Sequence, residues 1–276
     1  MWVILIDIRE KCQPHLWLLT GTAEGHLFAA ALIKEGWKIT VSVVSERASY
    51  PYQKLPIENI MVGPLMNEDE IRKVIINAKI NQNGFLCVID LTHPFALKIT
   101  PSVLRVCREL DQPFVRYERK IENISNAFLI KSFKDLSDFD LENKSILLAV
   151  GVRKLQEAIN ATKAAGAKAY SRILANPNSL KKILSSSISK NNFAVLNPSV
   201  GSDGLIEKAL VRKWKIDGVV CRQSGGVTEI LWHKICSSMN IKLWLLARPQ
   251  KYEKDYSIDS YDKLSKRLQL ICKNKV

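Results

Sequence analysis

Long hydrophobic runs are missing from this chain of 276 residues. The longest apolar stretches, such as residues 16–19 and 243–247, are far shorter than the roughly 20 residues that a membrane-spanning helix requires. We therefore expect no part of the chain to sit in a membrane. Hydrophobic residues still make up 47% of the sequence and charged residues 25%, which is typical of a folded globular protein.

Closely spaced cysteines are missing as well. The six cysteines include no C-x-x-C pair, and several of them lie within apolar runs (positions 12, 87, 107, 221, 236 and 272). This usage favours reduced thiols in the core of a cytoplasmic protein. His233 and Cys236 are three residues apart on an expected helix, but no second pair of ligands accompanies them, so we predict no metal site.

Acidic residues are few compared with basic ones. The chain has 27 Asp and Glu against 41 Lys and Arg, which gives a formal net charge of +14. Such a charge indicates an anionic partner, and nucleic acid, an anionic surface and an acidic small molecule all remain candidates. Because the basic residues are spread along the whole chain, we expect most of them on solvated faces, with a cleft of positive potential as the more specific alternative.

Short apolar segments alternate with segments of helical periodicity, which is the pattern of α/β layering around a largely parallel sheet. In the first half we predict helices near residues 24–35, 67–79 and 94–110, and strands at residues 15–20, 38–44, 58–63, 85–91 and 113–118. Asn67 is placed to cap the second helix. Pro94 suits the first position of the third helix, and Pro101 predicts a kink or restart within it.

Residues 120–144 lose this alternation, and we interpret them as the crossing between two domains. A second series follows, with helices near 153–165, 179–188, 204–214 and 228–239, and strands at 145–150, 168–173, 193–197, 217–222 and 242–247. The last segment predicts a docking helix with one apolar face, formed by Tyr261, Leu264, Leu268 and Ile271.

The simplest architecture is an α/β fold with two Rossmann-like domains, residues 1–125 and 140–276, each built on a mainly parallel sheet. Ligands of such sheets bind at the carboxyl ends of the strands. We expect a large substrate to lie in an interdomain cleft.

The first strand runs into "TGTAEG" (residues 20–25), which opens the first helix. Free N–H groups and the helix dipole at such a turn favour a phosphate. Gly21 permits close approach of the backbone, and Thr22 adds a hydroxyl donor. The turn lacks the G-x-G-x-x-G spacing, so a plain strand-to-helix bend remains the alternative.

The second strand ends at "SER" (residues 45–47). Rossmann-type sites recognise the ribose at this position, with an acid for NAD and a basic residue for the 2′-phosphate of NADP. Ser45 and Arg47 are placed for the phosphorylated cofactor, whereas Glu46 leaves the choice open.

The segment "VIDLTHPFALKIT" (residues 88–100) brings Asp90, Thr92 and His93 to the end of a strand. A lone histidine is usually structural. This one accompanies a hydroxyl and an expected helix N-terminus at a ligand-binding edge, which favours a functional role.

Arginines follow several other strands. Arg222 precedes a glycine turn, "SGG" (residues 224–226), that repeats the strand, turn and helix design of the opening motif and offers a second anion site. The other arginines at strand ends are Arg116, Arg119, Arg172 and Arg248. Several arginines at one edge suggest a substrate with more than one carboxylate.

Taken in order, the segments TGTAEG, VIDLTHPFA, VRYER, SRILANP, RQSGG and ARP resemble the precorrin-6A reductase family of cobalamin (vitamin B12) biosynthesis, including the cobalt-precorrin-6A reductases. The resemblance implies two Rossmann-like domains, NADPH as cofactor, and reduction of one double bond of the precorrin-6A macrocycle to give precorrin-6B. The acetate and propionate side chains of that macrocycle are a plausible partner for the basic chain. Three places depart from the family: Thr20 replaces the first glycine of Gly-Gly-Thr, Arg222-Gln223 replaces Lys-Asn, and Val62-Gly63-Pro64 stands where a glycine-rich stretch is expected after the third strand.

Residue roles follow from the resemblance together with the motifs. NADPH is expected on the first domain, with its pyrophosphate at Gly21, Thr22, Glu24 and Gly25, its 2′-phosphate at Ser45 and Arg47, and its nicotinamide beside Thr92 and His93. The macrocycle is expected in the interdomain cleft, where its carboxylates would meet Arg116, Arg119, Arg172, Arg222, Ser224, Gly225 and Gly226. His93, Thr92 and Arg222 are the candidate catalytic residues. His93 or solvent is preferred as proton donor, because arginine holds its proton tightly.

Two other functions remain open at this point. One is an NADP-dependent reductase or epimerase that acts on another anionic metabolite. The other is a non-catalytic α/β module that binds nucleic acid, although the chain lacks aromatic platforms interleaved with its basic residues. The oligomeric state, the preference for NADPH over NADH, and the choice between metal-free and cobalt-bound substrate are not determined by the sequence.

Overall fold

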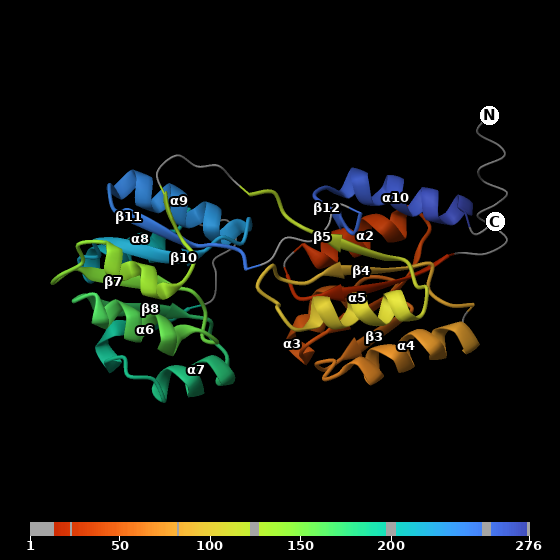
Figure 1. Ribbon diagram of the computed structural model, residues 1–276, viewed down its shortest axis with the longest axis horizontal. Coiled ribbons are helices and arrows are strands. Elements are labelled where there is room, and N and C mark those ends of the chain that lie inside the picture. Colours follow the sequence, from red (N-terminus) through yellow and green to blue (C-terminus); the bar gives the residue numbers. More distant parts are fainter. Residues whose placement is uncertain are drawn as a thin grey trace. The chain divides into compact units, whose positions relative to one another are not determined.

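The computed structural model describes residues 14–22, 24–81, 83–121, 127–196, 203–249 and 255–274. The chain divides into two compact units. The first consists of Met1–Arg119 together with Gln250–Val276, and the second is Lys120–Pro249. Each unit is one parallel sheet with helices on both faces (Figure 1). The expected α/β class with two Rossmann-like units is therefore confirmed.

The sheet of the first unit has the strand order β12-β5-β4-β1-β2-β3. Its strands are β1 (His15–Thr20), β2 (Lys38–Val43), β3 (Asn59–Val62), β4 (Cys87–Leu91), β5 (Phe114–Tyr117) and β12 (Ser257–Ile258). Its helices are α2 (Gly25–Lys34), α3 (Glu46–Ser49), α4 (Glu68–Asn81), α5 (Ile99–Glu109) and α10 (Tyr261–Asn274), with a 3-10 turn, η1, at Tyr50–Tyr52.

The sheet of the second unit has the order β6-β11-β10-β7-β8-β9. Its strands are β6 (Ala127–Ile130), β7 (Ser145–Ala149), β8 (Lys168–Ile173), β9 (Phe193–Val195), β10 (Gly218–Arg222) and β11 (Lys242–Leu246). Its helices are α6 (Leu155–Ala164), α7 (Pro177–Leu184), α8 (Leu205–Lys213) and α9 (Val227–Met239), with 3-10 turns η2 (Phe133–Asp138) and η3 (Lys190–Asn192).

Each of the two sheets has two hydrophobic cores, one on each face, because its central strands carry apolar side chains on both faces. In β1, Leu16 and Leu18 pack under α2 and α10, whereas Trp17 and Leu19 pack against α4 and α5. The same alternation divides β7 between its two faces. Burial on both sides explains the continuous hydrophobic runs of these strands. Within the described residues no helix is long and apolar enough to cross a membrane.

The C-terminal segment packs with the first unit and not with the second, so the expected boundary of 140–276 is wrong at its end. Leu264 and Leu268 of α10 are fully buried in the core that contains β1 and β2. The hydroxyl of Tyr261 also donates to Glu35 at 2.9 Å. The chain therefore passes between the units twice, near residue 120 and again near residue 249.

The segment 120–144 contains more structure than we expected. β6 pairs in parallel with β11 at the edge of the second sheet, and η2 follows it. Ser132 and Asp135 form a capping box at the start of η2. The apolar run is only four residues long and two of its side chains, Phe128 and Leu129, are exposed, so it gave little strand signal.

The helix expected at 94–110 begins five residues later, at Ile99. Residues 94–98 form turns instead. Pro101 lies in the first turn of α5. Backbone N–H groups of a first turn make no hydrogen bond within the helix, so a proline there, which lacks the N–H, neither kinks nor restarts the helix. Pro94 is consequently not the first residue of a helix.

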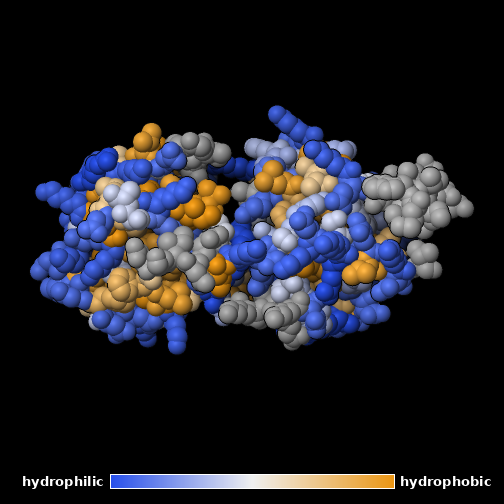
Figure 2. Space-filling view, turned by 90° about the horizontal axis from the view of Figure 1, so that it is seen from above, coloured by the Kyte–Doolittle hydropathy of each residue, from blue (hydrophilic) through white to orange (hydrophobic). Residues whose placement is uncertain are grey.

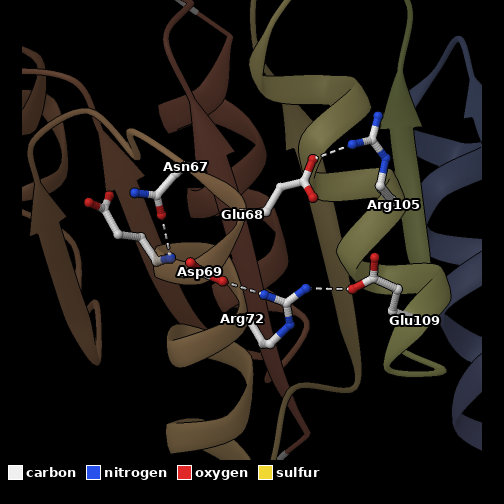
Figure 3. A network of polar contacts seen from close by, with 7 residues as sticks. Asn67, Glu68, Asp69, Arg72, Arg105 and Glu109 are labelled. Atoms are coloured by element: carbon white, nitrogen blue, oxygen red, sulfur yellow. Dashed lines mark hydrogen bonds and ion pairs between the residues drawn. The ribbon is translucent and has the colours of Figure 1, made fainter.

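Asn67 caps α4, as its sequence predicts: its side-chain oxygen accepts the N–H of Glu70 at 3.0 Å. Two ion pairs then join α4 to α5, Arg105–Glu68 at 2.7 Å and Arg72–Glu109 at 2.6 Å (Figure 3). Arg72 also contacts Asp69 on its own helix. These exposed pairs fix the spacing of the two helices, although each contributes at most about 1 kcal/mol.

Leu264→Ala is expected to destabilise the first unit by about 2–5 kcal/mol, because it deletes a fully buried side chain from that core. Hydrogen exchange measured by mass spectrometry should become faster in β1 and β2 and stay the same in β7 and β10. Leu270→Ala is the matched control, because this side chain of the same helix is 60% exposed. Faster exchange in β7 alone would contradict the placement of α10.

Candidate functional site

The topology of each sheet singles out one edge. β1 lies between β2 and β4, and β7 lies between β8 and β10, so the strand order reverses at these two places. Ligands of open parallel sheets bind outside the carboxyl ends of the strands at such a reversal. The residues predicted to bind the cofactor follow β1, β2 and β4, which are three neighbouring strands.

The turn between β1 and α2 holds Gly21, Thr22, Glu24 and Gly25. Gly21 is exposed, and a Cβ added to it would meet no atom within 4 Å. Gly25 is buried, and an added Cβ would lie 2.9 Å from the Cβ of Thr20 and against the hydroxyl of Tyr52. Glycine is therefore needed at residue 25 for packing, and the backbone around residue 21 has open space beside it.

Thr20, which departs from the family pattern, is buried in the interior of the unit. Its side chain is 3% exposed and donates from its hydroxyl to the carbonyl oxygen of Ser42 at 3.4 Å. Burial raises the pKa of Tyr52, and a hydrogen bond with Thr20 opposes this rise. The missing glycine thus changes the interior behind the turn and leaves its outer side unobstructed.

Glu24 and Arg119 bind each other, with an N–O distance of 2.6 Å. Burial is the largest influence on the Glu24 carboxyl and opposes its ionisation, but the hydrogen bond and positive charge of Arg119 outweigh it and lower the pKa. An ionised carboxylate only accepts hydrogen bonds, so the Glu24 side chain is not a phosphate ligand. Arg119, expected at a substrate carboxylate, has a carboxylate of the same chain as its partner.

A buried ion pair lies beneath the loop that follows β4. Asp90 is fully buried, and its Oδ1 accepts from Nη1 of Arg116 at 2.7 Å and from the N–H of Thr92 at 2.8 Å. Its Oδ2 accepts from the hydroxyl of Thr100 in α5 at 2.6 Å. Nη1 of Arg116 also donates to Oγ1 of Thr92 at 2.9 Å.

Arg116 was predicted to bind a substrate carboxylate, and the structure contradicts this. Its side chain is 1% exposed, so a substrate cannot reach the guanidinium. The sequence showed the charge of Arg116 but not its internal counter-charge. Thr100 was missed altogether, because a threonine in the first turn of a helix gives no sign of a partner ten residues earlier.

His93 lies beside this network and is partly exposed. Its Nδ1 accepts the backbone N–H of Phe95 at 3.1 Å. Because a backbone N–H can only donate, the neutral ring carries its proton on Nε2. The hydrogen-bond donor of the neutral His93 ring is therefore at Nε2.

Ser45 and Arg47 are both exposed at the end of β2. Ser45 precedes the short helix α3, and Arg47 lies within it. The structure thus brings them to the edge of the sheet that also carries the β1 turn and Thr92.

The second unit places Arg222 and Arg172 at the carboxyl ends of β10 and β8, on either side of β7. Gly151, which follows β7, has φ of +74°, and a Cβ added there would lie 3.4 Å from Nη2 of Arg222. Burial lowers the pKa of both arginines. Arg172 has a buried counter-charge, Glu207, at 3.5 Å.

The turn at residues 224–226 is largely satisfied by the chain itself, which weakens its prediction as an anion site. The side chain of Glu229 accepts the N–H of Gly225, and Oγ of Ser224 accepts the N–H of Gly226 at 3.4 Å. Glu229 thus occupies the position that an anion would take. The sequence contains a sign of this contact. Glu229 lies three residues after the N-cap residue Gly226, and an acid at that position commonly accepts a backbone N–H at the start of the helix.

Gln223, at the Arg222-Gln223 departure from the family, is held through its backbone by Arg248. Nε of Arg248 donates to the carbonyl oxygen of Gln223 at 2.9 Å, and Nη2 donates to that of Lys120 at 3.3 Å. The loop after β10 is therefore tied to both places at which the chain leaves the second unit. Arg248 is an internal support of this loop.

His233 and Cys236 provide no metal site in the described part of the chain, where no three His, Cys, Asp or Glu residues form a suitable group. His233 faces Glu229 at 3.7 Å. Burial raises the pKa of the Cys236 thiol to about 12.

Exposed apolar side chains accompany the polar ones at these edges. Val227, the first residue of α9, is 75% exposed, and Leu205, the first residue of α8, is 68% exposed. In the first unit, Leu27 and Val44 are exposed near the ends of β1 and β2. Figure 2 shows apolar patches within a largely hydrophilic surface on both units.

Comparison with known proteins agrees with this arrangement. The family model described as precorrin-6x reductase CbiJ/CobK matches residues 15–269. A cobalt-precorrin-6A reductase of Synechocystis sp. is 28% identical over 241 residues, which cover 85% of this chain and 88% of that protein. A precorrin-6A reductase of Mycobacterium tuberculosis is 27% identical over 236 residues, 84% of this chain and 88% of that protein.

A solved structure described as CobK precorrin-6A reductase has the same fold, with a TM-score of 0.73 and 16% sequence identity. The superposition covers 94% of this chain and 97% of that one. Because the family model spans nearly the whole sequence, this chain belongs to the precorrin-6x reductase (CbiJ/CobK) family.

Proposed function

We propose that this protein reduces one double bond of the precorrin-6A or cobalt-precorrin-6A macrocycle in cobalamin biosynthesis, with NADPH as the reductant. The observation that carries the proposal is the placement of Thr92 and His93 after β4, next to the open glycine turn after β1, at the reversal of a Rossmann-type sheet. Family membership supports the reaction, and the free cysteines of the described residues are compatible with a cytoplasmic enzyme.

The cofactor assignment rests on the first unit. The open space at Gly21 and the N–H groups at the start of α2 suit the pyrophosphate. Thr22 holds this turn to β4 by donating from Oγ1 to the carbonyl oxygen of Leu91 at 3.3 Å. Glu24 contributes by orienting Arg119 and not by touching phosphate. Ser45 and Arg47 would bind the 2′-phosphate.

NADPH supplies the hydride, so the chain has to orient the reactants and allow a proton to reach the neighbouring carbon. Protonation of His93 at Nδ1 would break its hydrogen bond with Phe95. His93 therefore acts as a hydrogen-bond donor from Nε2, and the proton comes from solvent. Arg222 serves charge stabilisation, because a guanidinium retains its proton.

The second unit is suited to the macrocycle. The carboxylates of the macrocycle would bind Arg222 and Arg172, although Glu207 already neutralises part of the charge of Arg172. The exposed Val227 and Leu205 offer apolar contacts for the ring itself. A macrocycle with an apolar body and an anionic rim suits both kinds of contact.

Anaerobic incubation with NADPH and either precorrin-6A or cobalt-precorrin-6A tests the proposed reaction. We expect oxidation of the cofactor together with formation of the reduced macrocycle. Oxidation with neither tetrapyrrole, combined with turnover of another anionic metabolite, would favour a different reductase. Failure to bind NADPH together with salt-sensitive binding of RNA or DNA would overturn the proposal.

Arg47→Ala should weaken NADPH binding by roughly 10- to 100-fold, because a hydrogen bond to a charged group is lost. NADH, which lacks the 2′-phosphate, should bind equally well to both proteins. Fluorescence titration measures both affinities. Arg212→Ala removes an exposed arginine from α8 in the second unit and serves as the control. An equal loss of NADH binding would show that Arg47 does not recognise the phosphate.

His93→Ala and His93→Gln separate the two roles of His93. If His93 only donates from Nε2, removing that donor should lower kcat/KM by about 10-fold, and the glutamine amide should recover part of the loss. An essential acid predicts losses of about 100- to 10,000-fold in both variants. Steady-state kinetics across a range of pH distinguishes these outcomes, and equally large losses would reject the donor role.

A further inference from the structure

The hydroxyl group of Thr92 has a partner for its oxygen but not for its hydrogen among the described residues. Its oxygen accepts a hydrogen bond from Nη1 of Arg116 at 2.9 Å. A guanidinium has no acceptor, so the roles in this hydrogen bond cannot be exchanged. The hydrogen of the Thr92 hydroxyl must therefore point elsewhere, and within the described parts of the chain no side chain or carbonyl accepts it.

Arg116 holds this arrangement because it is itself fixed. The same Nη1 atom donates to Oδ1 of Asp90 at 2.7 Å, and the side chain is 1% exposed. Asp90 in turn accepts the backbone N–H of Thr92 and the hydroxyl of Thr100. One buried ion pair thus sets both the backbone and the hydroxyl of Thr92.

We propose that Asp90 and Arg116 are positioning residues that commit Thr92 to donate its hydroxyl hydrogen to the carboxamide carbonyl oxygen of the reduced nicotinamide. This inference rests on the proposed NADPH site and specifies how that site selects the orientation of the carboxamide group. The carboxamide carries an acceptor oxygen and a donor NH2 group, and a committed donor binds only the oxygen. Thr92 is only partly buried, and it follows the strand next to the expected pyrophosphate turn.

Three cofactors test the proposal in binary titrations without macrocycle: NADPH, its 3-acetylpyridine analogue, which keeps the carbonyl oxygen but lacks the NH2 group, and its thiocarboxamide analogue, in which weakly accepting sulfur replaces the oxygen. Thr92→Val should weaken NADPH and the acetylpyridine analogue by about 3- to 10-fold each. The thiocarboxamide analogue should lose much less. Thr92→Ser, which keeps the hydroxyl, should recover most of the lost affinity.

Thr162→Val is the matched control, because it removes a hydroxyl that donates to Ala158 within α6 of the second unit. Thermal unfolding of each variant reports any general loss of stability. Should Thr92→Val fail to fold, Thr92→Ala takes its place, and it should lose the preference for NADPH and the acetylpyridine analogue over the thiocarboxamide analogue that wild type and Thr92→Ser show.

The outcomes separate this inference from the proposed function. A wild-type protein that binds no NADPH removes the proposed function and the inference together. NADPH binding that is the same in wild type and Thr92→Val overturns the inference alone. A variant that binds NADPH normally but has a raised KM for the macrocycle also overturns it, because the acceptor would then belong to the substrate.

Discussion

The geometry of the first unit depends on one buried ion pair, Asp90 with Arg116. Removing a charge pair from water costs several kcal/mol per ion unless other hydrogen bonds complete it. Here the carboxylate also accepts from Thr92 and Thr100, so β4, β5, α5 and the loop after β4 meet at a single side chain. Loss of either charged partner would leave an uncompensated buried charge, at a cost of about 3–5 kcal/mol. The edge that carries the candidate site is therefore held by electrostatics as well as by apolar packing.

Local patterns predicted most of the secondary structure, because strands buried on both faces give continuous apolar runs and capped helices carry their own signals, as at Asn67. β6 escaped prediction since it is a short edge strand with exposed side chains. The apolar face of α10 was correctly identified, but an amphipathic helix specifies only that a face is covered and not which core covers it. Its place on the first unit follows from long-range packing with β1 and β2.

The position of the candidate site could be predicted from the sequence, but the interaction partners of its charged side chains could not. The carboxyl edge of the sheet could be predicted because the ends of its strands can be recognised in the sequence. The residues that follow those strand ends are Gly21, Ser45, Thr92 and His93. Arg116 and Arg119 looked like ligand-binding residues, yet each has an acid of its own unit, Asp90 or Glu24, as its partner. Glu229 similarly fills the turn that was expected to receive a substrate anion. A sequence displays charges, whereas their pairing depends on contacts between residues that are far apart in the chain.

The double passage of the chain between the units has a consequence for how the protein forms on the ribosome. The second unit is continuous in sequence, so all of its strands are available once residue 249 has been made. The first unit is interrupted, and its outermost strand β12 and the core helix α10 are synthesised only after the whole second unit. Until then, the apolar face of β1 and β2 that α10 covers lacks its partner, and such exposed surface favours aggregation during folding. The first unit, although its synthesis begins first, is thus expected to be completed after the second.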